Sequence, residues 1–194
     1  TYTRGFTDNR LNHNLRTVAD GRRQTQFELG YARTEDPTDF DFDTVQSVLR
    51  GVEKKDIRRL ALTPAPSNNF ATVQCVINDF VGNVTEEFYD ARHRLLRRLE
   101  FTGRANPAEP TTDTLNRPIN PLRPEDPPFF ETRWEWNNDS LCVALHRPQT
   151  NRVEWVYQSG FDPNTPPRHR ANLRVERRVA NGDFDGDSRP DIVV

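Results

Sequence analysis

Hydrophobic and polar residues alternate with a period of two in several short stretches of the chain. Thr25, Phe27, Leu29 and Tyr31 share one parity, and residues 70–77 (FATVQCVI) are rich in β-branched and aromatic side chains. Both features are typical of strands with one buried face. The same pattern predicts a turn and then a strand within 36–51, and strands at 131–137, 141–146, 152–158 and 171–179. The outline is an all-β fold.

Residues 79–101 have the pattern of a hairpin. Turn residues fill 79–83 and 90–93, and alternating stretches fill 84–89 and 95–101. A helix over 86–100 is the competing interpretation, since four apolar side chains there would share one helical face. We favour the hairpin.

Two stretches lack any strand pattern. Residues 62–70 (LTPAPSNNF) are expected to form a loop. Residues 103–130 contain seven prolines, which can neither donate to a sheet ladder nor continue a helix. We expect a stiff surface insertion that lies over the sheet, with disorder as the alternative.

Composition restricts the functional classes. Among 194 residues only 34% are hydrophobic, and 15 prolines and 9 glycines favour short extended pieces over a helical bundle. The net charge of -2 provides no field that would hold nucleic acid. No apolar run approaches the roughly 18 residues of a membrane span. The chain contains no Met, so we expect it to be a processed chain or a segment of a longer protein.

The chain contains a weak internal repeat. Aligning residues 82–90 with 150–158, a shift of 68, matches Asn83 with Asn151, Glu86 with Glu154 and Tyr89 with Tyr157. A strand pattern follows each copy. The repeat therefore predicts a recurring hairpin, with a left-handed turn residue and an inward aromatic side chain.

The first of these copies resembles the tyrosine-aspartate (YD) repeats of RHS proteins. Their pattern is roughly G-N-x-T-x-x-x-Y-D-x-x-G-R-L, and the matching residues here are Asn83, Thr85, Tyr89, Asp90, Arg94 and Leu95. The chain departs from the pattern at His93, where the family usually has Gly. In the later copy Gln158 replaces the Asp, and a longer turn follows.

This resemblance implies an antiparallel hairpin array that forms part of a β-spiral shell. It implies a structural, non-enzymatic segment that builds a scaffold or encloses a toxin or effector domain, on a secreted or cell-surface protein. Its partners would be adjoining repeats of the parent chain or other copies of itself. The expected division is a repeat-like β region at 1–102, the Pro-rich insertion at 103–130, a second β region at 131–180 and an acidic tail at 181–194. No nucleophile or paired-carboxylate motif supports an enzyme.

The acidic tail has the pattern of a cation loop. Asp183, Asp185, Asp187 and Asp191 occupy relative positions 1, 3, 5 and 9, and the Arg189 carbonyl falls at position 7. Oxygen ligands on alternate residues of a curled loop suit Ca²⁺. The loop resembles those of FG-GAP and VCBS repeats, although Ser188 replaces the usual Gly. A solvated acidic turn is the alternative, and a calcium-dependent adhesion or glycan- or protein-binding module is the alternative function.

Two further groups of residues are candidates for structure or binding. Cys75 and Cys142 lie 67 residues apart, close to the repeat shift, so a cross-strand disulfide and two free thiols are both open. Trp134, Trp136 and Trp155 could form a ligand surface. An inward aromatic core is the favoured interpretation of the three tryptophans.

Overall fold

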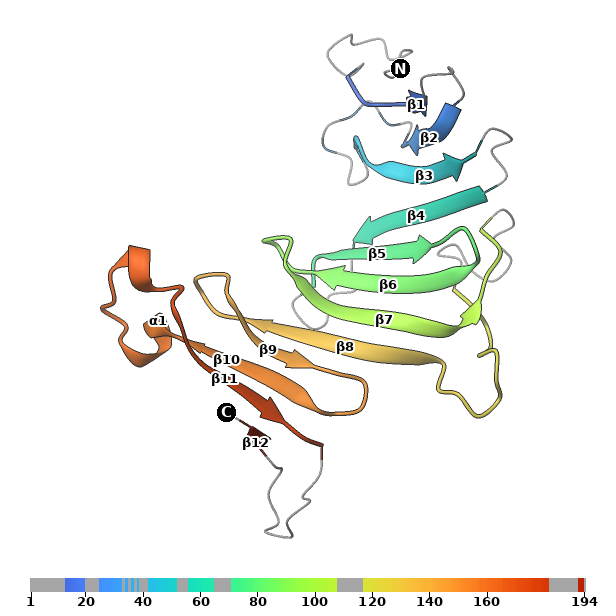
Figure 1. Cartoon of the computed structure of the whole chain (residues 1–194). Helices are drawn as coiled ribbons and strands as arrows, with labels where there is room; N and C mark the ends of the chain where they lie inside the picture. The colour runs from blue at the N-terminus through green and yellow to red at the C-terminus, as the bar shows by residue number, and fades with distance from the viewer. Residues whose placement is uncertain are drawn as a thin grey trace.

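The protein is an antiparallel β-sheet in which neighbouring strands follow one another in chain order (Figure 1). The computed structural model describes residues 13–19, 25–32, 34, 36, 38, 42–51, 56–64, 71–107, 117–181 and 192–193. Each strand pairs with the next along the chain, so the described strands form one sheet of twelve. The predicted all-β fold is confirmed.

The strands have the following bounds. They are β1 (Thr17–Ala19), β2 (Thr25–Tyr31), β3 (Val45–Arg50), β4 (Asp56–Pro64), β5 (Val73–Asn78), β6 (Asn83–Tyr89), β7 (Leu95–Arg104), β8 (Phe129–Trp136), β9 (Cys142–His146), β10 (Arg152–Tyr157), β11 (Leu173–Val179) and β12 (Ile192–Val193). A short helix, α1 (Gln158–Phe161), and a 3-10 turn, η2 (Pro167–His169), lie in the connection between β10 and β11.

Two local expectations have clear outcomes. Residues 79–101 form the hairpin of β6 and β7, and the competing helix is wrong. The loop expected at 62–70 is wrong over 62–64, because these residues complete β4. Strand β4 has no clean alternation, but β3 and β5 pair with it on both sides. Its strand conformation therefore comes from its neighbours more than from its own sequence.

One face of the sheet carries the buried core. Val76 and Val84 are fully buried and pack with Ala105, and Phe101 covers them. We call this side the arm face, because residues 117–128, hereafter the arm, lie against it. Apart from this cluster, buried apolar residues are few and scattered among the described residues. A single sheet has no second layer to bury its faces, so the core stays thin.

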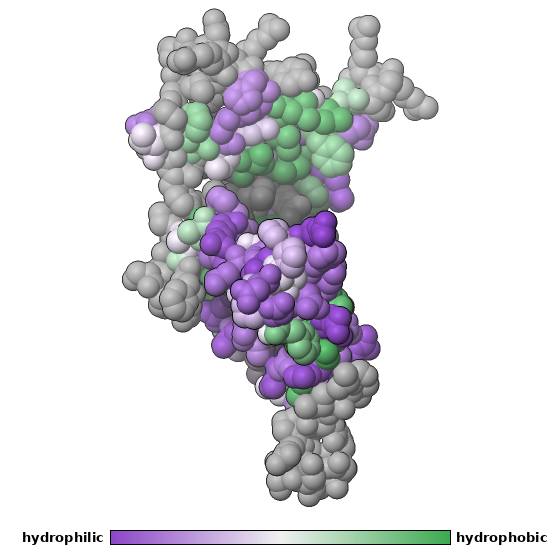
Figure 2. Space-filling view, turned by 90° about the vertical axis from the view of Figure 1, so that its left-hand side faces the viewer, coloured by the Kyte–Doolittle hydropathy of each residue, from purple (hydrophilic) through white to green (hydrophobic). Residues whose placement is uncertain are grey.

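On the face that Figure 2 presents, hydrophobic surface gathers over the N-terminal strands. Figure 2 shows it over the upper part of the molecule, at the height of the first strands in Figure 1, with a hollow beneath it and hydrophilic residues below. Val18 and Phe27 lie in these strands and are 41% and 40% exposed. Within the described ranges, no helix has the length and apolar character needed to cross a bilayer.

Candidate functional site

Four hairpin connections use the same five-residue turn. In each turn, the N–H of the first residue donates to the carbonyl of the fifth residue. The N–H of the fourth residue donates to the carbonyl of the first residue. The fourth residue always has a positive φ. This geometry is a type I turn followed by a left-handed residue, a common connection for twisted strands. The turns are 79–83, 90–94, 137–141 and 147–151.

The first residue of three turns holds the turn with its side chain. Oδ1 of Asp79, Asp90 and Asn137 accepts the N–H groups of the third and fifth residues at 2.8 to 3.0 Å. Such bonds make Asp and Asn natural turn residues. Burial opposes the ionisation of Asp90, but hydrogen bonds from Arg94 and the backbone outweigh burial and hold its pKa below the usual range.

The left-handed position of the turn at 90–94 is held by His93, where the repeat pattern has Gly. Gly82 takes this position in its own turn with φ 88°, whereas His93, Ser140 and Thr150 take it with φ 58°, 60° and 66°. Residues other than Gly have a steric cost in the left-handed region, because their Cβ atom approaches the backbone. The turn at 90–94 keeps the repeat geometry without the Gly that the family pattern places at His93.

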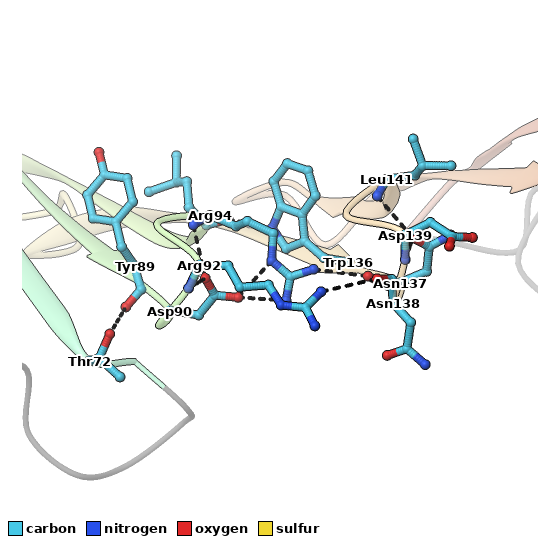
Figure 3. A network of polar contacts seen from close by, with 11 residues as sticks. Thr72, Tyr89, Asp90, Arg92, Arg94, Trp136, Asn137, Asn138, Asp139 and Leu141 are labelled. Atoms are coloured by element: carbon cyan, nitrogen blue, oxygen red, sulfur yellow. Dashed lines mark hydrogen bonds and ion pairs between the residues drawn. The ribbon is translucent and has the colours of Figure 1, made fainter. Parts of the chain in front are cut away.

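Polar side chains connect the turns at one end of the sheet (Figure 3). Arg94 pairs with Asp90 through Nε and Nη2 at 2.8 and 2.7 Å, and its Nη1 donates to the Asn137 carbonyl at 2.9 Å. Arg92 donates to the Asn138 carbonyl at 3.1 Å. The β6–β7 turn is thereby held against the β8–β9 turn.

At the same end of the sheet, the β8–β9 turn is also linked to the connection between β10 and β11. Nε of Arg170 pairs with both carboxylate oxygens of Asp139 at 2.9 Å, and its Nη1 donates to the Pro163 carbonyl at 3.2 Å. Trp136 adds a bond from Nε1 to the Leu95 carbonyl at 2.8 Å. Three successive connections are therefore linked along one end of the sheet.

The arm is anchored by a buried carboxylate. Glu86, on the arm face, accepts Nε and Nη2 of Arg117 at 3.0 and 2.5 Å and also accepts the amide of Gln74. Its side chain is only 4% exposed. The N–H of Leu122 donates to the Thr102 carbonyl at 3.3 Å, which brings the arm against β7. These contacts place residues 117–128 over the sheet, whereas 108–116 lie outside the described residues.

A groove of about 1460 Å³ runs along the arm face beside β8. Trp136, Asp90 and Arg94 line the end where the turns are linked, and Phe129 and Pro148 line the other end. The groove therefore follows the full length of β8, about 26 Å at the usual rise of a strand. Cross-strand pairs from β6 to β9 form its floor.

Charged side chains occupy the middle of the groove. Glu131 forms ion pairs with both Arg97 and Arg133, the latter at 2.7 Å. Hydrogen bonds from Arg133, together with the charge of Arg97, hold the pKa of Glu131 below its usual range despite partial burial. His146 lies 2.8 Å from Glu135. The Glu131 carboxylate thus pairs with two guanidinium groups at the centre of the groove.

The structure places the repeat residues at equivalent positions in two hairpins. Asn83 and Asn151 are the fifth residues of the β5–β6 and β9–β10 turns, and Tyr89 and Tyr157 end the strands that follow. Burial is the main cause that raises the pKa of both tyrosines. The shift of 68 residues therefore corresponds to four strands.

The remaining repeat residues lie within these strands. Thr85 of β6 pairs with Ile77 and Glu100, and Glu154 of β10 pairs with Ala144 and Arg177. Glu154 also accepts Nε of Arg152 at 2.6 Å. These contacts are those of ordinary sheet positions.

The structure has both cysteine thiols free. Cys75 lies on β5 and Cys142 on β9, and β6, β7 and β8 separate these strands. Four strand spacings amount to about 19 Å, whereas a disulfide needs Cα atoms within about 7 Å. The disulfide alternative is therefore corrected to two free thiols, whose spacing of 67 residues is one short of the repeat shift.

The three tryptophans do not form one platform. All are half-buried, and each has its own partner. Trp134 lies under the guanidinium of Arg98, 5.6 Å from its ring centre, and Trp155 donates to Glu176 at 3.1 Å. Trp134 and Trp136 both line the groove, and Trp136 is bonded to β7.

The predicted calcium ligands lie outside the described residues. Of the tail, the structure describes Asn181 and the two residues of β12, and β12 pairs with Arg178 and Val179 of β11. In the part of the chain that the structure does describe, no group of three or more His, Cys, Asp or Glu side chains could hold a metal ion.

Sequence reasoning missed the groove arginines, the Arg94 link and the Arg117 anchor. All three connect residues far apart in the chain, for which the sequence carries no local signal. Comparison with protein-family models and with curated proteins finds no match to this chain.

Proposed function

We propose that this chain is a structural segment of a larger β-sheet wall of the RHS/YD-repeat kind, which acts as a scaffold or encloses an effector domain. The observation that carries the proposal is the strand order. Twelve strands follow one another in one sheet, and among the described strands β1 and β12 each pair on one side only. Such a sheet grows by adding hairpins at its ends, as a wall requires.

The repeated turns support a structural role. Four hairpins share one turn geometry, and Arg94 and Arg170 tie neighbouring connections together. A single-layer sheet lacks a deep core to resist bending, so links between turns supply stiffness that burial does not. This arrangement suits a passive wall better than a flexible linker.

The thin core supports the proposal that the partners of this chain are strands that continue its sheet. Open sheet edges present unpaired backbone groups that recruit further strands. Adjoining repeats of a parent chain, or other copies of this one, would supply those strands. The enclosed effector and the secreted or cell-surface location follow from the family resemblance.

Sedimentation velocity tests the proposal, with circular dichroism as a measure of β content. A wall segment that lacks its neighbours should associate as its concentration rises, while its spectrum stays of the β type. A compact monomer at all concentrations, with cooperative two-state unfolding, would argue for a self-sufficient domain and against a wall segment.

A further inference from the structure

The groove beside β8 has more positive than negative charge. Its lining contains four arginines, Arg94, Arg97, Arg133 and Arg147, and three carboxylates, those of Asp90, Glu131 and Glu135. His146 faces Glu135. The whole chain has a net charge of -2, so the groove has the opposite sign to the molecule that contains it.

Two of these arginines have binding capacity left for a ligand. Among the described residues, Arg133 pairs through Nε and Nη2 with one carboxylate, that of Glu131, which Arg97 shares, and the Arg133 side chain is 63% exposed. Arg147 is exposed and makes no ion pair or side-chain hydrogen bond with any residue in the described ranges. Arg133 lies near the middle of the groove, and Arg147 lies next to it on the side away from the linked turns.

The shape of the groove indicates an extended ligand. Its volume of about 1460 Å³ exceeds the range of roughly 300–1,000 Å³ that is usual for small-molecule pockets. It runs parallel to a strand of eight residues, so a peptide of similar length would fit along it. Phe129 and Trp136 stand near its two ends and offer apolar contacts.

We infer that this groove binds an extended acidic peptide segment, with Arg133 and Arg147 as the carboxylate-binding residues. Guanidinium groups bind carboxylates through paired charge-assisted hydrogen bonds, and the aromatic ends favour apolar or proline side chains on the ligand. A neutral glycan would leave the excess positive charge unmatched. The inference goes beyond the scaffold role and does not depend on it.

Fluorescence anisotropy on the full chain tests the inference. The probe is a labelled ten-residue peptide that alternates glutamate with proline and phenylalanine, and its counterpart has every glutamate replaced by glutamine. We expect the glutamate probe to bind more tightly, and we expect added salt to weaken it. Equal binding of both probes, or no binding, would overturn the inference.

Variants locate the site. Replacing Arg133→Gln together with Arg147→Gln should weaken binding about tenfold, as the loss of two exposed charge pairs implies. Arg123→Gln is the matched control, since Arg123 is exposed on the arm and does not line the groove. Unchanged affinity in the double variant, or an equal loss in the control, would contradict the assignment.

A charge-reversal variant distinguishes a lost binding site from a misfolded protein. Arg133→Glu should lose the glutamate probe and gain affinity for the same peptide made with lysine, which a misfolded variant would not do. Tighter binding of an oligogalacturonate than of the acidic peptide would show an acidic-glycan site and overturn the peptide assignment.

Discussion

The guanidinium of Arg94 donates to the backbone carbonyl of Asn137 at 2.9 Å and so joins two turns that lie 43 residues apart. The same side chain neutralises Asp90 within its own turn. One residue thus stabilises a turn and connects it to the next, which is how a sheet without a second layer gains stiffness.

Replacing Arg94→Gln should lower the free energy of unfolding by about 2 kcal/mol. The variant loses a charge-assisted pair and leaves the buried Asp90 carboxylate with backbone donors only. Urea denaturation followed by circular dichroism gives the value. Arg92→Gln is the control, because Arg92 is exposed and makes a single bond to the neighbouring turn. Equal losses in both variants would show that the Asp90 pair contributes nothing.

Substitutions at two glycines should distinguish the cost of backbone strain from the cost of a steric clash. Gly82 and Gly51 have similar φ angles of 88° and 82°. An added Cβ would meet the Ala105 carbonyl oxygen at 2.9 Å at Gly82 and nothing within 4 Å at Gly51. Each change to Ala should cost about 1–2 kcal/mol for the left-handed conformation, and Gly82→Ala should cost more for the clash. A Gly51→Ala loss as large as that of Gly82→Ala would contradict the packing at Ala105.

The arm should detach when its anchor is removed. Among the described residues, Arg117→Ala leaves the buried Glu86 carboxylate with Gln74 as its remaining hydrogen-bond partner, and such a broken pair typically costs about 3 kcal/mol. Limited proteolysis should then cut within 117–128 faster than in the wild type. Arg123→Ala, an exposed change on the same arm, should alter neither stability nor cleavage.

Stability should fall in acid through Asp90. Its pKa in the folded chain lies below the value of about 3.9 that is usual for an unfolded Asp. The stabilisation is therefore fully present above that value and is lost as the pH falls through the folded pKa. Asp90→Asn keeps the turn, since Asn137 makes the same backbone bonds in its own turn. Urea unfolding from pH 7 to pH 2 should show the difference between wild type and variant shrinking, whereas a constant difference would contradict it.

The acidic tail should bind Ca²⁺. A cation held by Asp183, Asp185, Asp187 and Asp191 binds only the folded loop and therefore raises the melting temperature. Thermal unfolding with Ca²⁺ and then with EDTA measures the shift, and Asp185→Ala should abolish it. Ser188→Gly is the matched control and should keep it. A melt indifferent to Ca²⁺ would identify the tail as a solvated turn.

Local patterns predicted most of the strands and turns. Alternation identified β6 and β7, and β-branched and aromatic composition identified β5. Turn residues identified the turns before and after β6, because turn geometry depends on nearby residues. Strand β4 was missed because two arginines and an apolar run interrupt its alternation, and its neighbours determine its conformation.

The groove and the links between turns could not be predicted. Arg94 meets Asn137 and Arg117 meets Glu86 only once the strand order and register are known. The cysteines show the same limit. Their near-equivalent places were visible from the repeat shift, but the number of strands in one repeat decides whether they can bond.

Sedimentation velocity of the isolated chain from about 1 to 100 µM tests the central claim most directly. A wall segment with open sheet ends should sediment faster as its concentration rises, with β-type dichroism throughout. A concentration-independent compact monomer that unfolds in one cooperative step would contradict the account.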